Sequence, residues 1–188
     1  MTSGPVEPGS SIVLIGPMGA GKSSVARELA RMTSRRWIDT DKQIVRQTGQ
    51  TITEIFAREG EDHFRRLETE ALQSLASERR LIVATGGGIV TRPENIPLLR
   101  ALGCVAYLTA DPEVLFERVS RNRQRPLLQT DDPRVTLNEL IQRRESLYAG
   151  CAHFTLDTSV GTHAEIANTV LLYARQHFAA IGITSSLP

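Results

Sequence analysis

The sequence lacks any long hydrophobic run. None of its apolar stretches approaches the ~18 residues that a membrane-spanning helix needs. The first ten residues are rich in Gly, Pro and Ser, and they contain neither the apolar segment of a secretory signal nor the Arg-rich amphipathic pattern of a transit peptide. We therefore expect a soluble, cytoplasmic protein whose residues 1–10 form a disordered N-terminal tail.

Cysteine is scarce as well. Of the two cysteines, Cys104 lies in an apolar run and is expected in the core, and Cys151 follows Gly150 near a loop. Neither belongs to a CxxC pair or to a metal-ligand spacing, which indicates a reduced, intracellular compartment. The four histidines are His63, His153, His163 and His177. They show no metal-ligand spacing either, and we assign them no role.

No sign of charge predominates. Lys and Arg number 22 and Asp and Glu 21, a net charge of +1, whereas a dedicated nucleic-acid binder needs a basic excess to neutralise phosphates. The chain is 40% hydrophobic, which suffices for the core of one domain. We expect a single domain at residues 11–178, a C-terminal tail at residues 179–188, no nucleic-acid or membrane partner, and a monomer.

Five short apolar runs alternate with longer helical patterns along the chain. They cover residues 12–15, 37–38, 81–84, 104–108 and 154–156. Continuous apolar runs are typical of strands that are buried on both faces. Strands that alternate with helices form parallel sheets with helices on both sides. The pattern therefore predicts an α/β fold.

Capping patterns indicate where helices start. Thr followed three residues later by Glu, the pattern of a capping box, occurs at Thr51, Thr136 and Thr162. Asp111 precedes Pro112, which combines an N-cap residue with a proline at the first helical position. Apolar residues at helical spacing add a helix directly behind the first strand and helical periodicity across residues 64–75.

The strongest functional pattern is GPMGAGKS at residues 16–23, the complete G-x-x-x-x-G-K-[ST] motif between a predicted strand and a predicted helix. Its glycines let successive N–H groups point at phosphate oxygens, and the helix start adds partial positive charge. Lys22 can reach the β- and γ-phosphates, and the Ser23 hydroxyl can reach Mg²⁺. The chain has no Asn/Thr-Lys-x-Asp motif, which disfavours GTP. The motif alone does not separate a kinase from an ATPase.

Two carboxylates follow the second predicted strand. Asp39 and Asp41 are two residues apart, so in an extended chain they point to opposite sides and can do different jobs, one toward a metal and one toward a substrate. The same pair can equally be a helix N-cap with a neighbouring surface acid.

Two further patterns are also ambiguous when each is taken alone. Arg65 and Glu68, three apart on a helix, can be a functional pair or a solvated salt bridge. The three glycines after the third strand, Gly86-Gly87-Gly88, can let a ligand approach the backbone or form a flexible turn.

Taken together and in this order, the patterns resemble the shikimate kinase family over about residues 10–175. The matching segments are residues 16–23, Asp39-Thr40-Asp41, Phe64-Arg65-x-x-Glu68, Gly86-Gly87-Gly88, Arg125-Pro126-Leu127-Leu128 and Arg144-x-x-Leu147-Tyr148. The resemblance implies a three-layer P-loop kinase fold, similar to nucleoside-monophosphate kinases, with a five-stranded parallel sheet and a mobile lid loop. It implies ATP-dependent phosphorylation of the shikimate 3-hydroxyl to shikimate 3-phosphate, with release of ADP, a step of chorismate and aromatic amino-acid biosynthesis.

The resemblance also implies a nucleotide site. ATP would be held by Gly19, Ala20, Gly21, Lys22, Ser23, Ser24, Arg118 and Arg125. The cofactor Mg²⁺ would lie at Ser23 and, through water, at Asp39. The third strand carries no acid before Thr85, so the usual Walker-B aspartate is missing. The resemblance implies that Asp39 would take its metal-side role.

For the transfer itself, the resemblance implies that Lys22, Asp41 and Arg125 are catalytic, with Asp41 at the hydroxyl that becomes phosphorylated. The substrate set would be Asp41, Arg65, Gly86, Gly87, Gly88 and Arg144. Two arginines and an aspartate suit a small carboxylate with ring hydroxyls. Residues 118–134 would form the lid, which is polar, basic and broken by two prolines.

Two other functions compete with this interpretation. Another small-molecule P-loop kinase, such as a gluconate kinase, would keep the P-loop and the lid but would not need the Gly86-Gly87-Gly88 turn together with Phe64-Arg65-x-x-Glu68. A catalytically inactive nucleotide-binding regulator would not need Asp41, Arg65 and Arg144 together.

Overall fold

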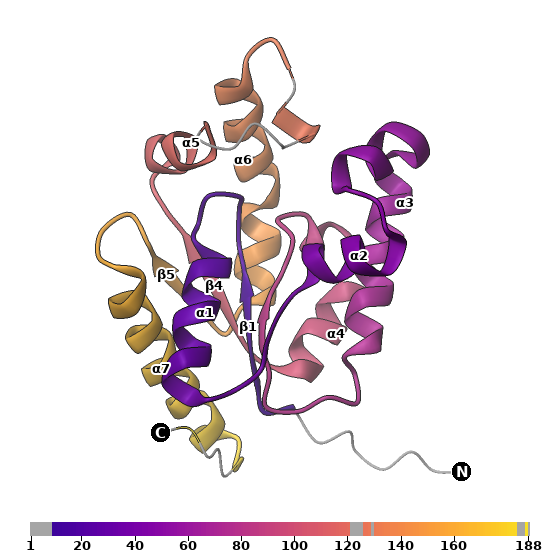
Figure 1. The fold of residues 1–188 in the computed structure, drawn as a ribbon. Coiled ribbons are helices and arrows are strands. Elements are labelled where there is room, and N and C mark those ends of the chain that lie inside the picture. Colours follow the sequence, from indigo (N-terminus) through magenta and orange to yellow (C-terminus); the bar gives the residue numbers. More distant parts are fainter. Residues whose placement is uncertain (1–8, 121–125, 129, 184–186, 188) are drawn as a thin grey trace.

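The computed structural model describes residues 9–120, 126–128, 130–183 and 187 (Figure 1). One sheet holds five strands: β1 (Ser11–Ile15), β2 (Trp37–Asp39), β3 (Ile82–Ala84), β4 (Gly103–Thr109) and β5 (Phe154–Asp157). Their order is β2-β3-β1-β4-β5, and every neighbouring pair is parallel. The predicted five-stranded parallel sheet is confirmed, and each predicted apolar run lies in one of its strands or overlaps it.

Helices connect the strands. They are α1 (Lys22–Thr33), α2 (Thr40–Thr48), α3 (Ile52–Ser74), α4 (Asn95–Leu102), α5 (Pro112–Ser120), α6 (Pro133–Cys151) and α7 (His163–Ala180), with two 3-10 turns, η1 (Ile89–Thr91) and η2 (Pro126–Leu128). The helix α4 has no counterpart among the helix starts that the sequence predicted. Within α3, Gly60 has φ 81° and ψ 172°, so the helix is kinked there.

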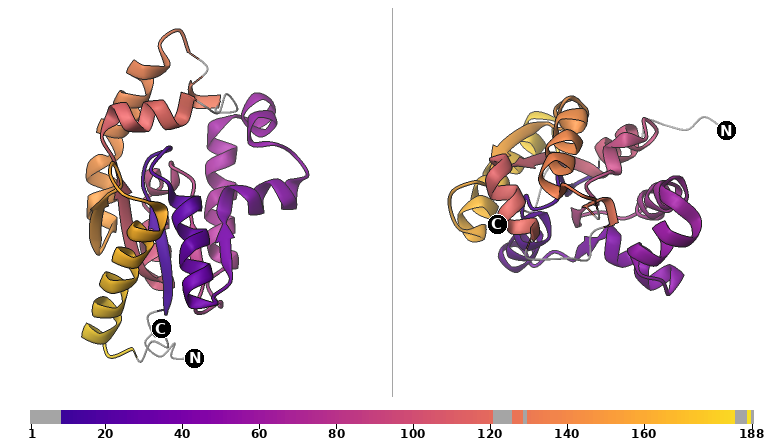
Figure 2. Two further views of the ribbon diagram at one scale, coloured as in Figure 1. Left: turned by 60° about the vertical axis from the view of Figure 1, so that its left-hand side comes forward. Right: turned by 90° about the horizontal axis from the view of Figure 1, so that it is seen from above.

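The two faces of the sheet bury two separate cores, which gives three layers (Figures 1 and 2). Ile12 and Leu14 of β1 contribute to the core that includes α1 and α7. Val13 and Ile15 contribute to the core that includes α3, α4 and α6. Successive side chains of a strand point to opposite faces, so a strand covered on both sides is apolar throughout. This is why the runs are continuous rather than alternating.

The helix starts follow the capping patterns with one exception. Thr51 and Thr162 both form complete capping boxes, and the Asp111 carboxylate accepts the N–H of Glu113 at 2.8 Å. The predicted capping box at Thr136 is wrong. Helix α6 starts earlier, because Asp132 accepts two backbone N–H groups and Pro133 fits the first helical position.

The ends of the domain differ from the expected boundaries. Gly9 is buried and donates its N–H to the carbonyl of Ala101 at 2.9 Å, and Ser10 accepts a hydrogen bond from buried Arg35. At the other end α7 continues to Ala180, and Ile183 packs against the core. The packed domain therefore includes residues that the sequence assigned to both tails. The remaining tail residues, 1–8, 184–186 and 188, lie outside the described residues.

The proposed lid is described only in part. Its described pieces are the end of α5, the turn η2 and residues 130–134, whereas Arg125 lies outside the described residues. None of the helices in the described part of the chain combines the length and apolarity that crossing a bilayer requires.

Candidate active site

The loop after β1 and the start of α1 form a compact turn around the Lys22 side chain. Gly21 has φ 82° at the N-cap of α1, a left-handed conformation that favours glycine. Lys22 is 8% exposed, and its Nζ donates to the carbonyls of Gly16 and Pro17 at 2.7 and 2.8 Å. These bonds fix a positive charge directly over the loop. A loop of this kind binds phosphate groups.

Ser23 and Asp39 meet at the ends of two different elements. The Ser23 hydroxyl, in the first turn of α1, donates to Asp39 Oδ2 at 2.7 Å. The other oxygen of Asp39 accepts the N–H of Lys42 at 3.2 Å and caps α2. Asp39 is therefore an N-cap and a partner of the P-loop serine at once. Asp41 lies in the first turn of α2, so the helix start, rather than an extended chain, separates the two carboxylates.

A cavity opens above this loop, beyond the carboxyl ends of the strands. It is lined by Met18, Gly19, Gly21, Lys22, Ser23, Ser24, Asp39, Asp41, Thr85, Gly87, Arg118 and His163. The structure thus brings together the described residues predicted for the nucleotide, with one exception. Ala20 is fully buried beneath the loop, where its N–H donates to Pro17 and its carbonyl accepts from Thr158.

Arg118 and His163 lie at the rim of this cavity. Arg118 Nη2 donates to the carbonyl of Thr158 at 2.7 Å, and Nη1 donates to the carbonyl of Gly19 at 3.3 Å. His163, the first residue of α7, lies so close to the P-loop that a Cβ on Gly21 would be 3.6 Å from its ring. A planar cation and a planar ring therefore border the same cavity.

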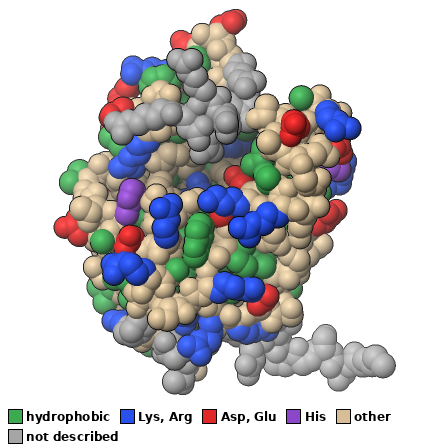
Figure 3. Space-filling view, in the orientation of Figure 1, with side chains coloured by type: hydrophobic (Ala, Val, Ile, Leu, Met, Phe, Trp, Pro, Cys, Tyr) green, Lys and Arg blue, Asp and Glu red, His purple; other side chains and the backbone are tan. Residues whose placement is uncertain are grey.

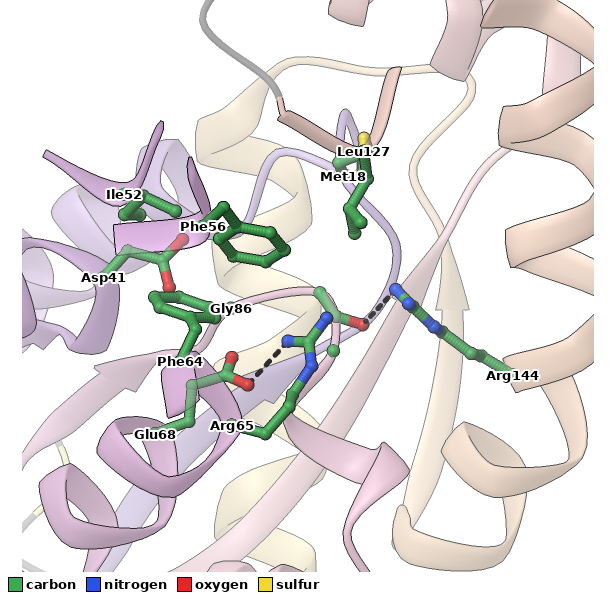
Figure 4. Close-up of a pocket in the computed structure, with 12 residues that line it drawn as sticks. Met18, Asp41, Ile52, Phe56, Phe64, Arg65, Glu68, Gly86, Leu127 and Arg144 are labelled. Atoms are coloured by element: carbon green, nitrogen blue, oxygen red, sulfur yellow. Dashed lines mark hydrogen bonds and ion pairs between the residues drawn. The ribbon is translucent and has the colours of Figure 1, made fainter. Parts of the chain in front are cut away.

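A second cavity adjoins the first (Figure 4). It is lined by Met18, Asp41, Ile52, Phe56, Phe64, Arg65, Glu68, Gly86, Gly87, Gly88, Leu127 and Arg144. Met18, Asp41 and Gly87 line both cavities, so the two meet at these residues. The space-filling view shows a hollow at this end of the molecule, with Lys and Arg side chains gathered on the face below it (Figure 3).

Arg65 is buried between two carboxylates of α3. Its Nη1 donates to Glu68 at 2.6 Å, and its Nη2 and Nε donate to Glu61 at 2.6 and 3.1 Å. Burial acts to lower the pKa of Arg65, but the two carboxylates outweigh it and raise that pKa above its usual range. The Arg65–Glu68 pair is thus a buried, fixed pair that faces a cavity, not a solvated surface salt bridge.

Glu68 itself is completely buried. Burial, reinforced by the nearby Asp41 carboxylate, raises the pKa of Glu68 to about 7, against the opposing effect of Arg65 and Arg144. Glu68 therefore titrates near neutral pH, and the electrostatics of the second cavity depend on pH in that range.

The three glycines after β3 make room for these side chains. A Cβ on Gly86 would lie 2.4 Å from Glu68 Oε1 and 2.6 Å from Asp41 Oδ1. A Cβ on Gly88 would lie 1.9 Å from Arg65 Nη1. Charged groups of α2 and α3 therefore approach the backbone of this turn closely. Close packing, rather than a need for a flexible turn, explains why glycine occupies these positions.

From the opposite side, α6 reaches the same turn. Arg144 Nη1 donates to the carbonyl of Gly87 at 3.3 Å, and the hydroxyl of Tyr148 donates to that carbonyl as well. Figure 4 shows Arg65 and Arg144 on opposite sides of the turn, both directed toward the cavity. Two guanidinium groups that flank one cavity are a donor set of the kind that suits a carboxylate.

Known proteins resemble this chain along most of its length. The profile of the shikimate kinase family matches residues 18–175. A shikimate kinase of Acinetobacter baylyi is 44% identical over 161 residues, which is 86% of this chain and 89% of that protein. The chain belongs to the shikimate kinase family.

Solved structures agree with this family assignment. A structure of shikimate kinase from Acinetobacter baumannii in complex with shikimate has a TM-score of 0.85 and 41% identity, covering 88% of this chain and 93% of that one. A gluconokinase from Sinorhizobium meliloti has a TM-score of 0.59 and 20% identity, over 95% of this chain and 98% of that one. The gluconokinase therefore shares the fold alone.

Several residues that line this site escaped the sequence argument. Ile52 and Phe56 form apolar wall, and their spacing on a helix resembles that of ordinary core residues, whereas Leu127 belongs to the matched Arg125-Pro126-Leu127-Leu128 segment but was given no role. His163 follows the capping residue Thr162, where nothing in the sequence distinguishes it from any helix start. Tyr148 was part of the Arg144-x-x-Leu147-Tyr148 motif, but the sequence did not show which group its hydroxyl contacts.

One group of possible metal ligands lies far from the P-loop, at the opposite ends of the strands. Atoms of Cys104, His153 and His177 lie within 4.8 Å of one another, although their sequence spacing gave no hint of it. Nδ1 of His153 accepts the N–H of Val105 at 2.9 Å, so in the neutral ring Nε2 carries the proton. Neither nitrogen of His153 then has a lone pair for a metal, and the cluster is best explained as packing of neighbouring rings.

Proposed function

We propose that this protein transfers the γ-phosphoryl group of ATP to the 3-hydroxyl of shikimate. The observation that carries the proposal is the meeting of two cavities at Met18, Asp41 and Gly87. One cavity has a phosphate-binding loop and the other has two guanidinium groups, Arg65 and Arg144. The shikimate of the Acinetobacter baumannii complex is a small carboxylate, and its negative charge suits a cavity flanked by two guanidinium groups.

In this proposal Arg65 and Arg144 bind the shikimate carboxylate from two sides, assisted by the N–H groups of Gly87 and Gly88, since the N–H of Gly86 donates to Thr40. Asp41 lies at the junction of the cavities, where a substrate hydroxyl faces the phosphate. It orients that hydroxyl and accepts its proton as the phosphoryl group is transferred. Alignment of this kind removes much of the entropic barrier.

At the nucleotide end, the backbone of Gly19 and of residues 21–24 surrounds the phosphates, with Ala20 supporting the loop from beneath, and Lys22 neutralises the γ-phosphate charge. We place the adenine base at the rim, between Arg118 and His163, because planar groups stack on purines. Arg125, outside the described residues, is proposed to reach the phosphate from the lid and to share its charge. The apolar side chains of Met18, Phe56 and Leu127 keep water from the acceptor hydroxyl.

The donor set at the first cavity fits Mg²⁺. Ser23 Oγ and Asp39 Oδ2, both hard oxygen donors, lie 2.7 Å apart beside the P-loop. A bound Mg²⁺ supplies charge neutralisation at the β- and γ-phosphates. Ser23 would hold Mg²⁺ directly and Asp39 would hold it through water. The proposed enzyme is a cytoplasmic monomer whose two substrates are ATP and shikimate.

A coupled ADP-release assay tests the proposal. We expect ADP release with shikimate and at most a small fraction of that rate with gluconate or with no acceptor. An equal rate with gluconate would favour a different small-molecule kinase, and no acceptor-dependent release in a folded, ATP-binding protein would favour a regulator.

The Arg65→Lys variant tests the carboxylate site. Lysine keeps the charge but loses the planar two-pronged donor set, so the shikimate KM should rise about ten- to a hundredfold. The ATP KM should stay within about threefold, because the P-loop is unchanged. An unchanged shikimate KM would remove Arg65 from the substrate site.

A further inference from the structure

The carbonyl of Gly87 is held by two donors of different character. The Arg144 guanidinium donates to it through Nη1 at 3.3 Å, a long hydrogen bond, and the neutral Tyr148 hydroxyl donates to it as well. Arg144 lines the substrate cavity, but Tyr148 does not. The two donors reach the same oxygen from one face of α6, since they are four residues apart.

Tyr148 is fixed in place by its surroundings. It is 1% exposed, and its ring stacks on the Tyr107 ring of β4, with 5.0 Å between the ring centroids. Burial raises the pKa of Tyr148 to about 12, so the phenol keeps its proton and remains a donor at any pH at which the enzyme would be assayed. A rigid, protonated and buried hydroxyl is well suited to fixing the orientation of one peptide group.

The peptide that it fixes has a donor on its other side. In a trans peptide the C=O of one residue and the N–H of the next point in opposite directions, and no peptide bond among the described residues is cis. The Gly87 carbonyl accepts from α6, so the Gly88 N–H points away from α6. The Arg65 guanidinium lies beside Gly88, where a Cβ would be 1.9 Å from Nη1. Among the hydrogen bonds of the described residues, none uses the N–H of Gly87 or Gly88.

We infer that Tyr148 is a positioning residue for the substrate, acting through the Gly87–Gly88 peptide. By holding the Gly87 carbonyl, it keeps the Gly88 N–H directed into the substrate cavity. It also keeps that carbonyl hydrogen-bonded when Arg144 turns from it to a substrate carboxylate. Without the hydroxyl, moving Arg144 would leave a half-buried carbonyl without a hydrogen bond from α6, which opposes binding. This inference rests on the proposed function, in which Arg144 binds the carboxylate.

The test is Tyr148→Phe, with Tyr107→Phe as its matched control. Both variants remove one buried hydroxyl and keep the stacked rings, but the Tyr107 hydroxyl interacts with the Thr109 side chain instead of the glycine turn. For Tyr148→Phe we expect the shikimate KM and Kd to rise about three- to tenfold, with the ATP KM within about twofold. Tyr107→Phe should leave all three constants within about twofold.

A double-mutant cycle with Arg144→Lys separates positioning from general packing. If Tyr148 acts by releasing Arg144, Tyr148→Phe should weaken shikimate binding much less in the Arg144→Lys background than in the natural enzyme. An unchanged shikimate Kd in Tyr148→Phe, an equal rise in Tyr107→Phe, or fully additive effects in the cycle would each overturn the inference. Failure of the proposed function would show differently, as an absence of shikimate-dependent ADP release in the unaltered enzyme.

Discussion

At the scale of single residues, the site depends on side chains that do two jobs. Asp39 caps α2 with one oxygen and accepts the Ser23 hydroxyl with the other. Its structural role and its proposed metal-side role therefore coexist, although the sequence presented them as alternatives. Asp41, in the first turn of the same helix, lines both cavities, which is the position that the proposed base requires.

Replacing Asp41 by Asn tests that division. Asn keeps the size of the side chain but cannot accept a proton, so phosphoryl transfer to shikimate should fall by about 10²–10⁴-fold. The Kd of ATP, measured by calorimetry, should change little. If ATP affinity collapses while transfer per bound ATP persists, the roles of Asp39 and Asp41 have been assigned the wrong way round.

The raised pKa of Glu68 predicts a pH dependence of stability. Its pKa is about 7 in the folded protein and near the usual 4.5 in the unfolded chain, so the folded state binds more protons between these values. The contribution of Glu68 to the free energy of unfolding is therefore fully present below pH 4.5 and is lost as the pH rises through 7. Within this window, each pH unit changes the contribution of Glu68 to the free energy of unfolding by ~1.4 kcal/mol at most.

The measurement is urea unfolding of the natural protein and of Glu68→Gln between about pH 5 and pH 8. Glutamine does not titrate. From about pH 5 to pH 8 the free energy of unfolding of the natural protein should therefore fall by about 2 kcal/mol relative to that of Glu68→Gln. A constant difference across the range would show that Glu68 stays ionised throughout.

At the scale of elements, the turn after β3 is where α2, α3 and α6 come together. Asp41 comes from α2, Arg65 and Glu68 from α3, and Arg144 from α6. All approach three consecutive glycines, because only a turn without side chains lets three helices place charged groups at one strand end. The glycines therefore determine how closely the charged groups of α2 and α3 can approach this turn.

Gly88→Ala should weaken shikimate binding without unfolding the protein. The new methyl group would overlap the Arg65 guanidinium, which would have to leave its present position between Glu61 and Glu68. We expect the shikimate KM to rise at least about tenfold, with Tm lowered by only a few degrees. Gly150→Ala on α6, where a Cβ would contact nothing within 4 Å, is the matched control and should leave the KM unchanged. Equal KM values in the two variants would contradict the prediction.

At the scale of the whole molecule, the packed domain begins two residues earlier than the sequence indicated. Arg35 is 6% exposed, and its Nη1 donates to the Ser10 carbonyl at 2.6 Å, while Nε and Nη2 are buried without hydrogen-bond partners among the described residues. Burial, reinforced by the nearby charge of Arg80, lowers the pKa of Arg35 to about 10. The Ser10 carbonyl therefore stabilises a buried charge.

Two truncations test this boundary. A chain that starts at Ser11 loses the Ser10 carbonyl and the Gly9–Ala101 hydrogen bond, and it should be about 1–3 kcal/mol less stable than a chain that starts at Gly9. The substrate constants should be equal in the two proteins, because these residues lie at the end of β1 opposite the P-loop. Identical denaturation midpoints would show that residues 9 and 10 contribute nothing to the stability of the domain and belong to the tail.

The sequence by itself determined the features that local chemistry encodes. The continuous apolar runs predicted the buried parallel sheet, and the P-loop motif predicted the phosphate loop, because each depends on neighbouring residues or on a simple period. The capping boxes at Thr51 and Thr162 were predictable for the same reason. The one at Thr136 was not, since Asp132 competes for the same helix start and binds two backbone N–H groups there.

Only the tertiary structure decided what the ambiguous residues do. Arg65 and Glu68 have the spacing of a surface pair, and the packing of α3 against the sheet is what buries them beside a cavity. Tyr148 and His163 gained their positions from α6 and α7, and the Tyr148–Gly87 hydrogen bond joins residues that are 61 positions apart in the chain. Such contacts arise from the packing of whole elements, and no local pattern records them.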